Sequence, residues 1–513
     1  MIKNWIDAAA ARWTDACYLE DAGGAGQLTF AGLQRSTRAW ARYLDRAGVA
    51  PGSRVALRLP DPLGYASALV AILGAGRVVV PLDPAAPAAE LARVFEVARP
   101  QAVVTDGGLA PSLPGRGLPG PDLPAWGLPV LTPPGPDEAG ELGQPDAATS
   151  AGGIFLCTSG TTGTPKGVLL RESQLSHVAG CVAIHHRLTP ADRGYCCLPL
   201  FHVNAEVVGL LATLAARACL VVDRRFSPRG FWAMIEEQEI TWINAVPAII
   251  TILAREPDAA RTPGRIRFVR SASAPLPPSA SRRFEQRFGV PIIETYGMTE
   301  AASMITTNPL DGPRKPGSAG RPAGAQVRVV QQARGRYVPC PRGTVGQVQI
   351  RGRGVIGAYA AGGRPGAIGP DGWLDTGDLG HLDRDGYLFL AGRSDDVINR
   401  GGEKIYPREI EDFLVAQPGV RSAVVVAARD EVLGQVSVAF VVPAGPGRPD
   451  YLPDAQLEQT LRAACAAALP RFKRPTAFYL VHELPLGPGG KVARRRLQAL
   501  AAAHRPPESG AAA

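Results

Sequence analysis

Apolar and polar positions follow two different periods along the first hundred residues. Apolar residues recur with helical spacing over 33–47 and 65–75, whereas the short apolar runs at 54–59 and 78–80 predict strands. The same alternation returns at 231–246, where a helical pattern precedes a strand-like one. Helices that alternate with buried strands predict parallel sheets covered by helices, so the expected fold class is α/β.

The pattern changes near Gly392. Beyond this residue the periods predict a helix, two strands, a second helix and a last strand, at 407–416, 422–427, 436–442, 457–469 and 477–481. This content is typical of a small α+β domain. We therefore expect a large N-terminal domain of parallel and mixed sheets with helices at 1–391, a small C-terminal α+β domain at 392–504, and a disordered tail at 505–513.

The composition is that of a folded protein with more than one domain, since the chain has 513 residues, 46% of them hydrophobic and 20% charged. The apolar stretch 205–222 contains Glu206 and Arg217, which argues against a membrane span. The N-terminus lacks the apolar region of a signal peptide. Residues 106–150 are rich in Pro and Gly and predict irregular surface structure.

Cysteine and histidine usage predicts no metal site. Eight cysteines without a Cys-x-x-Cys spacing indicate reduced thiols and a cytoplasmic location. We interpret Cys196 and Cys197 as core residues, and His185 and His186 as a helix-surface pair rather than ligands.

The net charge of +9 suits polyanionic ligands, but the arginines are spread along the chain and only 494–496 forms a tight run. The sequence has neither interleaved aromatic residues nor a known nucleic-acid-binding module. We therefore do not expect a nucleic acid as partner.

The segment 158–167 carries the strongest chemical signal. Five hydroxyls, three glycines and Lys166 lie within ten positions, directly after the apolar run 154–156. Glycines let backbone N–H groups turn toward an anion, and hydroxyls add further donors. The common P-loop is excluded, because Pro165 precedes the lysine and Gly167 follows it. We predict a phosphate-binding loop formed by Thr158, Ser159, Gly160, Thr161, Thr162, Gly163, Thr164 and Lys166.

A polar pentapeptide, Tyr296-Gly297-Met298-Thr299-Glu300, follows the predicted strand 291–294. The Thr299 hydroxyl is a candidate phosphate donor, and the Glu300 carboxylate is a candidate ligand for Mg²⁺. Another segment, 271–276, contains Ser273, Ala274 and Pro275.

Further candidates lie at turns. Asp378 is suited to accept both hydroxyls of a ribose, and Arg393 offers a fork for phosphate or ribose oxygens. Gly401 and Gly402 would let backbone line a narrow channel. Lys491 lies on a Gly-rich loop from which it can reach a reacting anion.

Two more features need an interpretation. His202 ends an apolar segment and is a candidate for lining an acyl pocket. The segment 352–357 matches the dinucleotide-binding fingerprint, but 358–365 is rich in Gly and ends in Pro365. Because the fingerprint requires a following helix, we reject that reading.

In this order and at roughly this spacing, the segments resemble the adenylate-forming superfamily, which includes acyl-CoA synthetases, luciferases and adenylation domains. The resemblance covers about residues 20–500 and is nearest to acyl-CoA synthetases. Segments 268–276 and 296–320 are similar to the branch that includes oxalate–CoA ligases. The resemblance implies that ATP activates an acid to an acyl-adenylate with release of pyrophosphate, and that CoA then accepts the acyl group.

The resemblance also implies ATP, Mg²⁺ and CoA as ligands, a mobile C-terminal domain, and one role for each candidate residue. These roles are phosphate binding for Thr158 to Gly167, adenine binding for Ser273, Ala274, Pro275 and Tyr296, ATP binding for Gly297, phosphate and Mg²⁺ binding for Thr299 and Glu300, ribose binding for Asp378 and Arg393, the hinge for Asp395, the CoA tunnel for Gly401 and Gly402, and catalysis of adenylation for Lys491.

The chain departs from the superfamily at several positions. Gln347 stands where Glu is usual, and Leu-Gly-Pro-Gly-Gly precedes Lys491 where relatives commonly have Thr or Ser with an Arg nearby. Asn204 and Ser303 replace histidines that are common in the oxalate branch, so the small acid stays open. One alternative is transfer of the adenylate to an amine, with nitrite among the candidate acids, for amide or N–N bond formation or diazotisation in secondary metabolism. A non-catalytic nucleotide-binding protein is disfavoured, because Lys491 and Glu300 are present.

Overall fold

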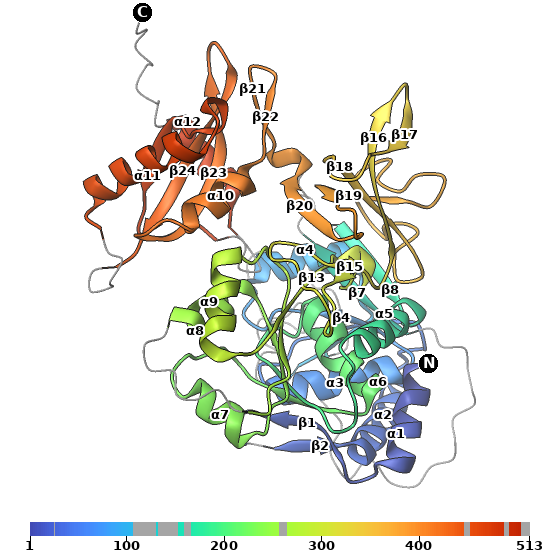
Figure 1. The fold of residues 1–513 in the computed structure, drawn as a ribbon. Helices are drawn as coiled ribbons and strands as arrows, with labels where there is room; N and C mark the ends of the chain where they lie inside the picture. The colour runs from blue at the N-terminus through green and yellow to red at the C-terminus, as the bar shows by residue number, and fades with distance from the viewer. Residues whose placement is uncertain are drawn as a thin grey trace, which may run out of the picture. The chain divides into compact units, whose positions relative to one another are not determined.

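The computed structural model describes residues 1–24, 26–105, 130–131, 152–158, 166–255, 264–445, 452–486 and 492–503 (Figure 1). Most of the segment 106–150 and the tail 505–513 lie outside the described residues, so both expectations stay predictions. The chain forms two compact units, described separately below: unit 1 comprises Met1–Leu276, Arg283–Val327 and Gln349–Leu374, and unit 2 comprises Pro277–Arg282, Arg328–Val348 and Asp375–Ala513. The domain boundary expected at Gly392 stays a prediction.

Unit 1 contains a six-stranded sheet with the order β6-β5-β3-β4-β7-β8. Neighbouring strands from β6 to β7 pair in parallel, and β8 closes an antiparallel hairpin with β7. The strands are β3 (Arg54–Leu57), β4 (Val78–Pro81), β5 (Ala102–Val104), β6 (Val130–Leu131), β7 (Gly153–Thr158) and β8 (Lys166–Arg171).

The second sheet of unit 1 has nine strands in the order β15-β14-β13-β12-β11-β9-β10-β1-β2. The six strands from β13 to β1 are parallel, and antiparallel strands flank them on both sides. The strands are β1 (Cys17–Asp21), β2 (Gln27–Thr29), β9 (Arg193–Cys196), β10 (Cys219–Val222), β11 (Trp242–Ala245), β12 (Phe268–Ser271), β13 (Ile292–Tyr296), β14 (Thr306–Thr307) and β15 (Arg321–Pro322).

Helices alternate with these strands, as the sequence pattern predicts. Helix α2 shows why the helices form. The Thr29 hydroxyl caps the first turn of α2 by accepting a hydrogen bond from the Gly32 N–H at 3.1 Å, and the apolar stripe of the helix is buried. The helices are α1 (Ile2–Arg12), α2 (Phe30–Arg46), α3 (Pro62–Gly74), α4 (Ala88–Ala98), α5 (Glu172–His185), the π-helix η3 (Asn204–Leu211), α6 (Ala212–Ala216), α7 (Phe231–Glu237), α8 (Pro247–Arg255), α9 (Pro278–Phe288) and the 3₁₀-helix η4 (Thr299–Ala301).

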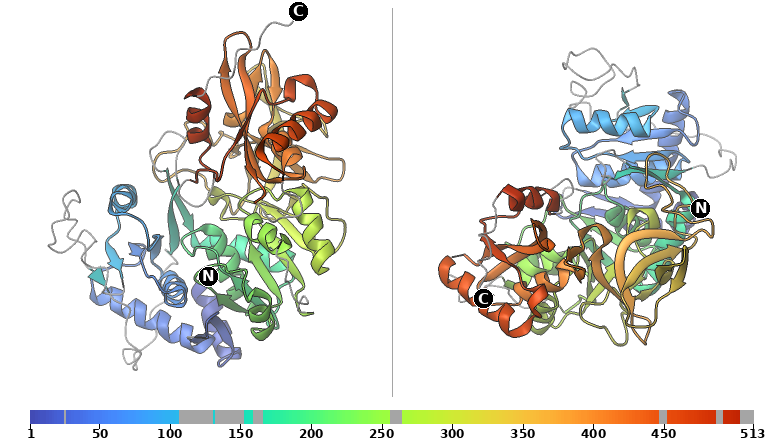
Figure 2. Two further views of the ribbon diagram at one scale, coloured as in Figure 1. Left: turned by 90° about the vertical axis from the view of Figure 1, so that its left-hand side faces the viewer. Right: turned by 90° about the horizontal axis from the view of Figure 1, so that it is seen from above.

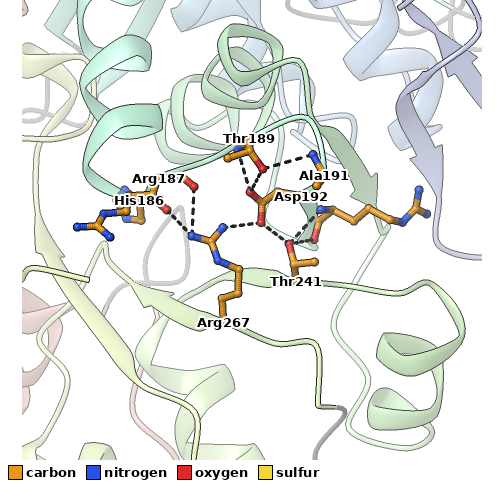
Figure 3. A network of polar contacts seen from close by, with 8 residues as sticks. His186, Arg187, Thr189, Ala191, Asp192, Thr241 and Arg267 are labelled. Atoms are coloured by element: carbon orange, nitrogen blue, oxygen red, sulfur yellow. Dashed lines mark hydrogen bonds and ion pairs between the residues drawn. The ribbon is translucent and has the colours of Figure 1, made fainter. Parts of the chain in front are cut away.

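The buried carboxylate of Asp192 forms hydrogen bonds at the amino ends of three parallel strands (Figure 3). Asp192 directly precedes β9, Thr241 precedes β11 and Arg267 precedes β12. Asp192 accepts from the Thr241 hydroxyl at 2.8 Å and from Arg267 Nη1 at 2.5 Å, and also from the N–H and hydroxyl of Thr189. The contacts fix the starting point of β12, whose opposite end leads to the predicted site residues Ser273, Ala274 and Pro275.

A five-stranded sheet follows with the order β17-β16-β18-β19-β20. Its strands are β16 (Gln326–Ala333), β17 (Arg336–Pro339), β18 (Gly346–Arg351), β19 (Leu374–Leu382) and β20 (Leu388–Arg393). No helix follows Gly352 up to Pro365, in agreement with the rejection of a dinucleotide fingerprint.

The C-terminal part of unit 2 is a small α+β structure whose sheet has the order β22-β21-β24-β23, with β25 parallel to β24. Apolar side chains of α10 and α11 pack on one face of this sheet, and those of α12 pack on the other. In the left view of Figure 2, the ribbons of α11 and α12 lie on opposite sides of the sheet. The elements are η5 (Ser394–Asp396), β21 (Ile398–Arg400), β22 (Glu403–Ile405), α10 (Pro407–Val415), β23 (Val420–Asp430), β24 (Gly434–Pro443), α11 (Asp454–Ala468), η6 (Arg471–Lys473), β25 (Ala477–Leu480) and α12 (Arg494–Ala503).

The α/β fold class is therefore confirmed, with a C-terminal α+β part. Among the described residues, every helix is too short or too polar to span a bilayer.

Candidate active site

Several predicted site residues lie at the carboxyl ends of parallel strands in unit 1. Tyr296 ends β13, and Ser273 lies two residues beyond β12. In open α/β sheets, ligands bind outside the carboxyl ends of the strands. The topology therefore assigns these two predicted adenine-binding residues to the edge of the sheet where a ligand site is expected.

The loop after β12 exposes Ser273, Ala274 and Pro275. Ser273 adopts a left-handed backbone conformation with φ of 73°, which is uncommon for a residue other than glycine. Its hydroxyl accepts a hydrogen bond from Asn204 Nδ2 at 3.2 Å. The strain and the hydrogen bond together fix the position of the Ser273 side chain.

A buried arginine lies behind this loop. Arg270 of β12 is 1% exposed, and its Nη1 donates to the side-chain oxygens of Asn204 at 2.7 Å and Asn244 at 3.1 Å. Its Nε has no hydrogen-bond partner among the described residues. Burial lowers the pKa of Arg270 to about 9, so the group is still charged at neutral pH. The structure therefore holds a positive charge beneath Asn204 and Ser273, and its described contacts are to neutral oxygens.

The pentapeptide after β13 turns sharply. A Cβ on Gly297 would lie 1.2 Å from the carbonyl oxygen of Ser303, so only glycine fits at this position. The turn leads into η4, where Thr299 is half-buried and Glu300 is 7% exposed.

Tyr359 joins two of the predicted site residues. Its hydroxyl donates to Glu300 Oε1 at 3.0 Å, and Lys166 Nζ lies 5.6 Å from the centre of its ring. Gly167 donates its N–H to the Ala361 carbonyl at 2.8 Å, which holds β8 beside the segment that carries Tyr359. The structure thus brings the predicted phosphate-binding lysine and the predicted metal ligand to one aromatic side chain. Sequence reasoning missed Tyr359, which lies 59 residues from Glu300 and belongs to no recognised motif.

Part of the predicted site lies outside the described residues. This applies to Lys491, to the side chain of Thr158, and to the loop residues Ser159, Gly160, Thr161, Thr162, Gly163 and Thr164. The strands on either side of the loop, β7 and β8, are described and form a hairpin in which Thr158 pairs with Lys166.

Unit 2 carries the predicted ribose-binding pair. Asp378 of β19 lies opposite Arg393 of β20, and Arg393 Nη1 lies 3.1 Å from Asp378 Oδ1. The same nitrogen donates to the Thr376 carbonyl at 3.0 Å. A Cβ on Gly377, where φ is 75°, would lie 2.8 Å from Arg393 Nη2, so the glycine leaves room for the guanidinium. The structure thus brings together Asp378 and Arg393, the two residues predicted to bind the ribose.

The predicted hinge and tunnel residues lie at exposed positions of unit 2. Asp395 is in the 3₁₀-helix η5. Gly401 and Gly402 form the turn between β21 and β22 with φ of 56° and 95°, and the Gly402 N–H donates to Asn399 Oδ1 at 3.0 Å. Gln347, the departure in β18, has a buried Oε1 without a partner among the described residues.

Three predictions about histidines and cysteines have different outcomes. Cys196 and Cys197 are buried, as expected. His202 is exposed and its ring lies 4.7 Å from that of Phe201, so a role in an acyl pocket stays a prediction. The interpretation of His185 and His186 as a surface pair is wrong for His186, which is 1% exposed and packs against Phe268. A signal was present, because His186 follows the buried Val182 by four residues and therefore continues its helical face.

Comparisons with known proteins identify the family. The model of the AMP-binding enzyme family matches residues 6–360, and the model of the AMP-binding enzyme C-terminal domain matches residues 409–491. Sulfoacetate–CoA ligase of Cupriavidus necator is 39% identical over 96% of both chains. Oxalate–CoA ligase of Arabidopsis thaliana is 34% identical over 89% of this chain and 90% of its own.

Solved structures agree as well. The crystal structure of ATP-bound MatB from Rhodopseudomonas palustris has a TM-score of 0.84 at 29% identity, over 98% of this chain and 99% of its own. The o-succinylbenzoate coenzyme A synthetase of Bacillus subtilis in complex with ATP and magnesium ion has a TM-score of 0.79 at 26% identity, over 96% of this chain and 99% of its own. The resemblance to adenylate-forming enzymes is confirmed, and the chain belongs to the AMP-binding enzyme family.

Proposed function

We propose that this protein is an AMP-forming acid–CoA ligase. It converts an acid and ATP to an acyl-adenylate and pyrophosphate, then transfers the acyl group to the thiol of CoA and releases AMP. The observation that carries the proposal is the similarity to a sulfoacetate–CoA ligase over 96% of both chains. The matched C-terminal family model, which ends at Lys491, supports the same conclusion.

The first half-reaction brings anions together, since the carboxylate of the acid must approach the α-phosphate of ATP. In our proposal the loop from Thr158 to Gly167 binds the β- and γ-phosphates, with Lys166 as a positive charge. Tyr296 and the Ser273–Pro275 loop frame the adenine, and Thr299 donates to a phosphate. Fixed donors of this kind stabilise charge that develops in the transition state.

The donor set at Glu300 fits Mg²⁺. The carboxylate is a hard oxygen ligand, it is 7% exposed, and the Tyr359 hydroxyl orients it at 3.0 Å. We propose Glu300 as a ligand of the ion, with Thr299 beside it. A bound Mg²⁺ would neutralise charge on the phosphates.

Unit 2 supplies the remaining roles. Asp378 binds the ribose hydroxyls and Arg393 orients that carboxylate, which the 3.1 Å contact between them supports. Lys491 stabilises charge during adenylation. We propose that the segment after Asp395 then rotates, withdraws Lys491 and presents Gly401 and Gly402 to the CoA arm.

We further propose that the acid is small and carries a second anionic group. Arg270 supports this, because its buried guanidinium donates to the neutral side-chain oxygen of Asn204. Asn204 in turn donates to the hydroxyl of Ser273, in the loop after β12. Sulfoacetate and oxalate, the acids in the names of two relatives, both have two acidic groups. Asn204 and Ser303 stand where the oxalate branch commonly has histidines, so we favour an acid other than oxalate.

Pyrophosphate release with ATP and a panel of acids tests the proposal. The panel contains sulfoacetate, oxalate, acetate and nitrite, and each reaction is repeated with CoA or an amine before mass spectrometry of the product. We expect a thioester with an acid of two anionic groups. Pyrophosphate release without any thioester would contradict the ligase assignment. The relatives named above are CoA ligases, so the comparisons do not support an amine acceptor.

Asn204→Asp tests the acid class separately. The variant places a carboxylate 2.7 Å from the Arg270 guanidinium and so neutralises the charge that would attract a second anion. We expect the ratio of kcat/KM for sulfoacetate over acetate to fall at least about tenfold, or about 1.4 kcal/mol. An unchanged ratio in a folded variant would exclude Arg270 as the charge that selects the acid.

A further inference from the structure

Two cysteines and a glutamate converge at the edge region of the nine-stranded sheet, in unit 1. Cys17 and Glu20 lie on β1, and Cys219 lies on the neighbouring strand β10. The Sγ atoms of the two cysteines are 3.1 Å apart, and Glu20 Oε2 is 3.9 Å from Cys17 Sγ. The two cysteines are separated by 202 positions in the sequence, so neither a spacing motif nor a turn brings them together.

A cation lies beside the two sulfurs. Arg193 of β9 pairs with Cys219 across the parallel strands, and its Nη2 binds Glu20 Oε2 at 2.8 Å. The hydrogen bond with Cys17 and the charge of Arg193 lower the pKa of Cys219, although burial opposes this. The hydrogen bond with Cys219 and burial raise the pKa of Cys17. The charge of Arg193 thus favours a thiolate in this pair, and a thiolate beside a cation is the reactive form.

The group is reachable from solvent. Cys17 is half-buried, and the side chains of Glu20 and Arg193 are 23% and 24% exposed. Cys219 itself is 6% exposed. A small oxidant can approach from the exposed side, whereas a folded protein cannot easily reach Cys219.

The contacts favour a disulfide over a metal ion. The donor atoms of Cys17, Glu20 and Cys219 lie within 4.8 Å of one another, which is compatible with a metal. However, Arg193 already neutralises the Glu20 carboxylate. Two thiolates on one tetrahedral zinc are about 3.8 Å apart, given Zn–S bonds of about 2.3 Å, and these sulfurs are closer. They need to approach by only about 1 Å to reach disulfide length.

We propose that Cys17 and Cys219 form a reversible disulfide when the protein meets a small disulfide oxidant of the glutathione type. The Cys219 thiolate attacks one sulfur of the oxidant, whose S–S bond breaks and releases one thiol. Cys17 then gives its proton to solvent and attacks the Cys219 sulfur, which releases the second thiol. Two protein thiols are oxidised, and one external disulfide is reduced to two thiols. The bond ties β1, near the edge of the sheet, to β10.

Peptide mapping of the full chain tests this modification site. The protein is incubated with oxidised glutathione and unfolded in denaturant, its free thiols are blocked with N-ethylmaleimide, and the digest is examined by mass spectrometry. We expect two of the eight thiols to resist blocking, one linked peptide pair containing Cys17 and Cys219, and reversal by dithiothreitol. Oxidation should also raise the unfolding temperature of unit 1 by about 2–4 °C, because the bond restricts the unfolded chain.

Serine variants test the order of the two steps. In Cys17→Ser, glutathione should stay attached to Cys219, because no second thiol can release it. In Cys219→Ser the linked peptide cannot form, and glutathione should attach to Cys17 more slowly than it attaches to Cys219 in Cys17→Ser. Cys181→Ser is the matched control, since that half-buried thiol contacts His177 rather than a cysteine, and the variant should keep the Cys17–Cys219 link.

Two outcomes would overturn the proposal. The first is a wild-type protein that carries glutathione on Cys17 or Cys219 without the linked peptide. The second is stoichiometric zinc in the protein that both serine variants lose, because the three side chains would then form a metal site. Neither outcome depends on the acid–CoA ligase activity, so this inference and the proposed function can fail independently.

Discussion

Replacing Asp192 by Asn tests whether one buried carboxylate holds the amino ends of β9, β11 and β12 together. Asp192 is 3% exposed and accepts four hydrogen bonds, from the N–H and hydroxyl of Thr189, the hydroxyl of Thr241 and Nη1 of Arg267. A carboxylate offers about four lone-pair sites, so all of them are used. In Asp192→Asn the amide NH₂ faces donors, and at least two of the four lose their acceptor.

The expected cost follows from these contacts. A buried donor that loses its acceptor costs about 1–3 kcal/mol, and breaking a buried ion pair costs about 3–5 kcal/mol. The Arg267 side chain is 33% exposed, so water partly compensates its loss. We therefore expect Asp192→Asn to lower the free energy of unfolding of unit 1 by about 3 kcal/mol.

Urea unfolding followed by tryptophan fluorescence measures this value. All seven tryptophans lie at or before Trp373, so the signal reports on unit 1. Asp311→Asn is the matched control, because Asp311 pairs with Arg187 and both side chains are mostly exposed, which predicts a change below about 1 kcal/mol. If the two variants lose the same small amount, the network does not hold the strand ends and the reasoning is refuted.

Three further changes have defined outcomes. Gly297→Ala should reduce ATP–pyrophosphate exchange at least about tenfold, because its Cβ would collide with the Ser303 carbonyl. The control Gly357→Ala has open space around the new Cβ and should keep its activity. Equal activities of the two variants would disprove the steric argument. Lys491→Ala should lower the same exchange about a hundredfold or more, since one preorganised contact contributes about 3 kcal/mol, and retention of more than about a tenth would contradict the role. Burial and, less strongly, the charge of Arg270 lower the pKa of His186 to about 3. The neutral histidine therefore costs no stability above about pH 6.5, and the free energy of unfolding falls as the pH drops from 6.5 toward 3. In urea unfolding from pH 7 to 4, this fall should be smaller in His186→Phe by up to about 1.4 kcal/mol per pH unit. Parallel curves for the two proteins would show that His186 does not cause the pH dependence.

The elements with a strong period were predictable from sequence. The pattern at 33–47 corresponds to α2, and the patterns after residue 407 correspond to α10, β23, β24, α11 and β25. Periodicity succeeds here because one face of each element must be buried, which constrains the sequence at every turn. The rejected fingerprint at 352–357 was also predictable, since glycines and Pro365 cannot continue a helix.

The contacts between distant residues were not predictable. The structure joins Asn204, Asn244 and Arg270, and it joins Glu300 to Tyr359, although no sequence spacing links them. A period fixes which face of an element is buried but not which element covers it. The meeting of Cys17 with Cys219 depends on the strand order, which places β10 next to β1.

The number of hydrogen bonds that a buried carboxylate already accepts distinguishes a structural acid from a ligand-binding one. The sequence does not contain this information. Asp192 and Glu300 are both nearly buried. Asp192 accepts four hydrogen bonds, so its acceptor sites are filled and a cation would have to displace them. Glu300 accepts from Tyr359 among the described residues, which orients the group and leaves acceptor capacity for a metal ion. In the described contacts, Asp192 has no acceptor site left for a cation, whereas Glu300 does. This difference supports a structural role for Asp192 at the strand ends and the proposed role of Glu300 as a Mg²⁺ ligand.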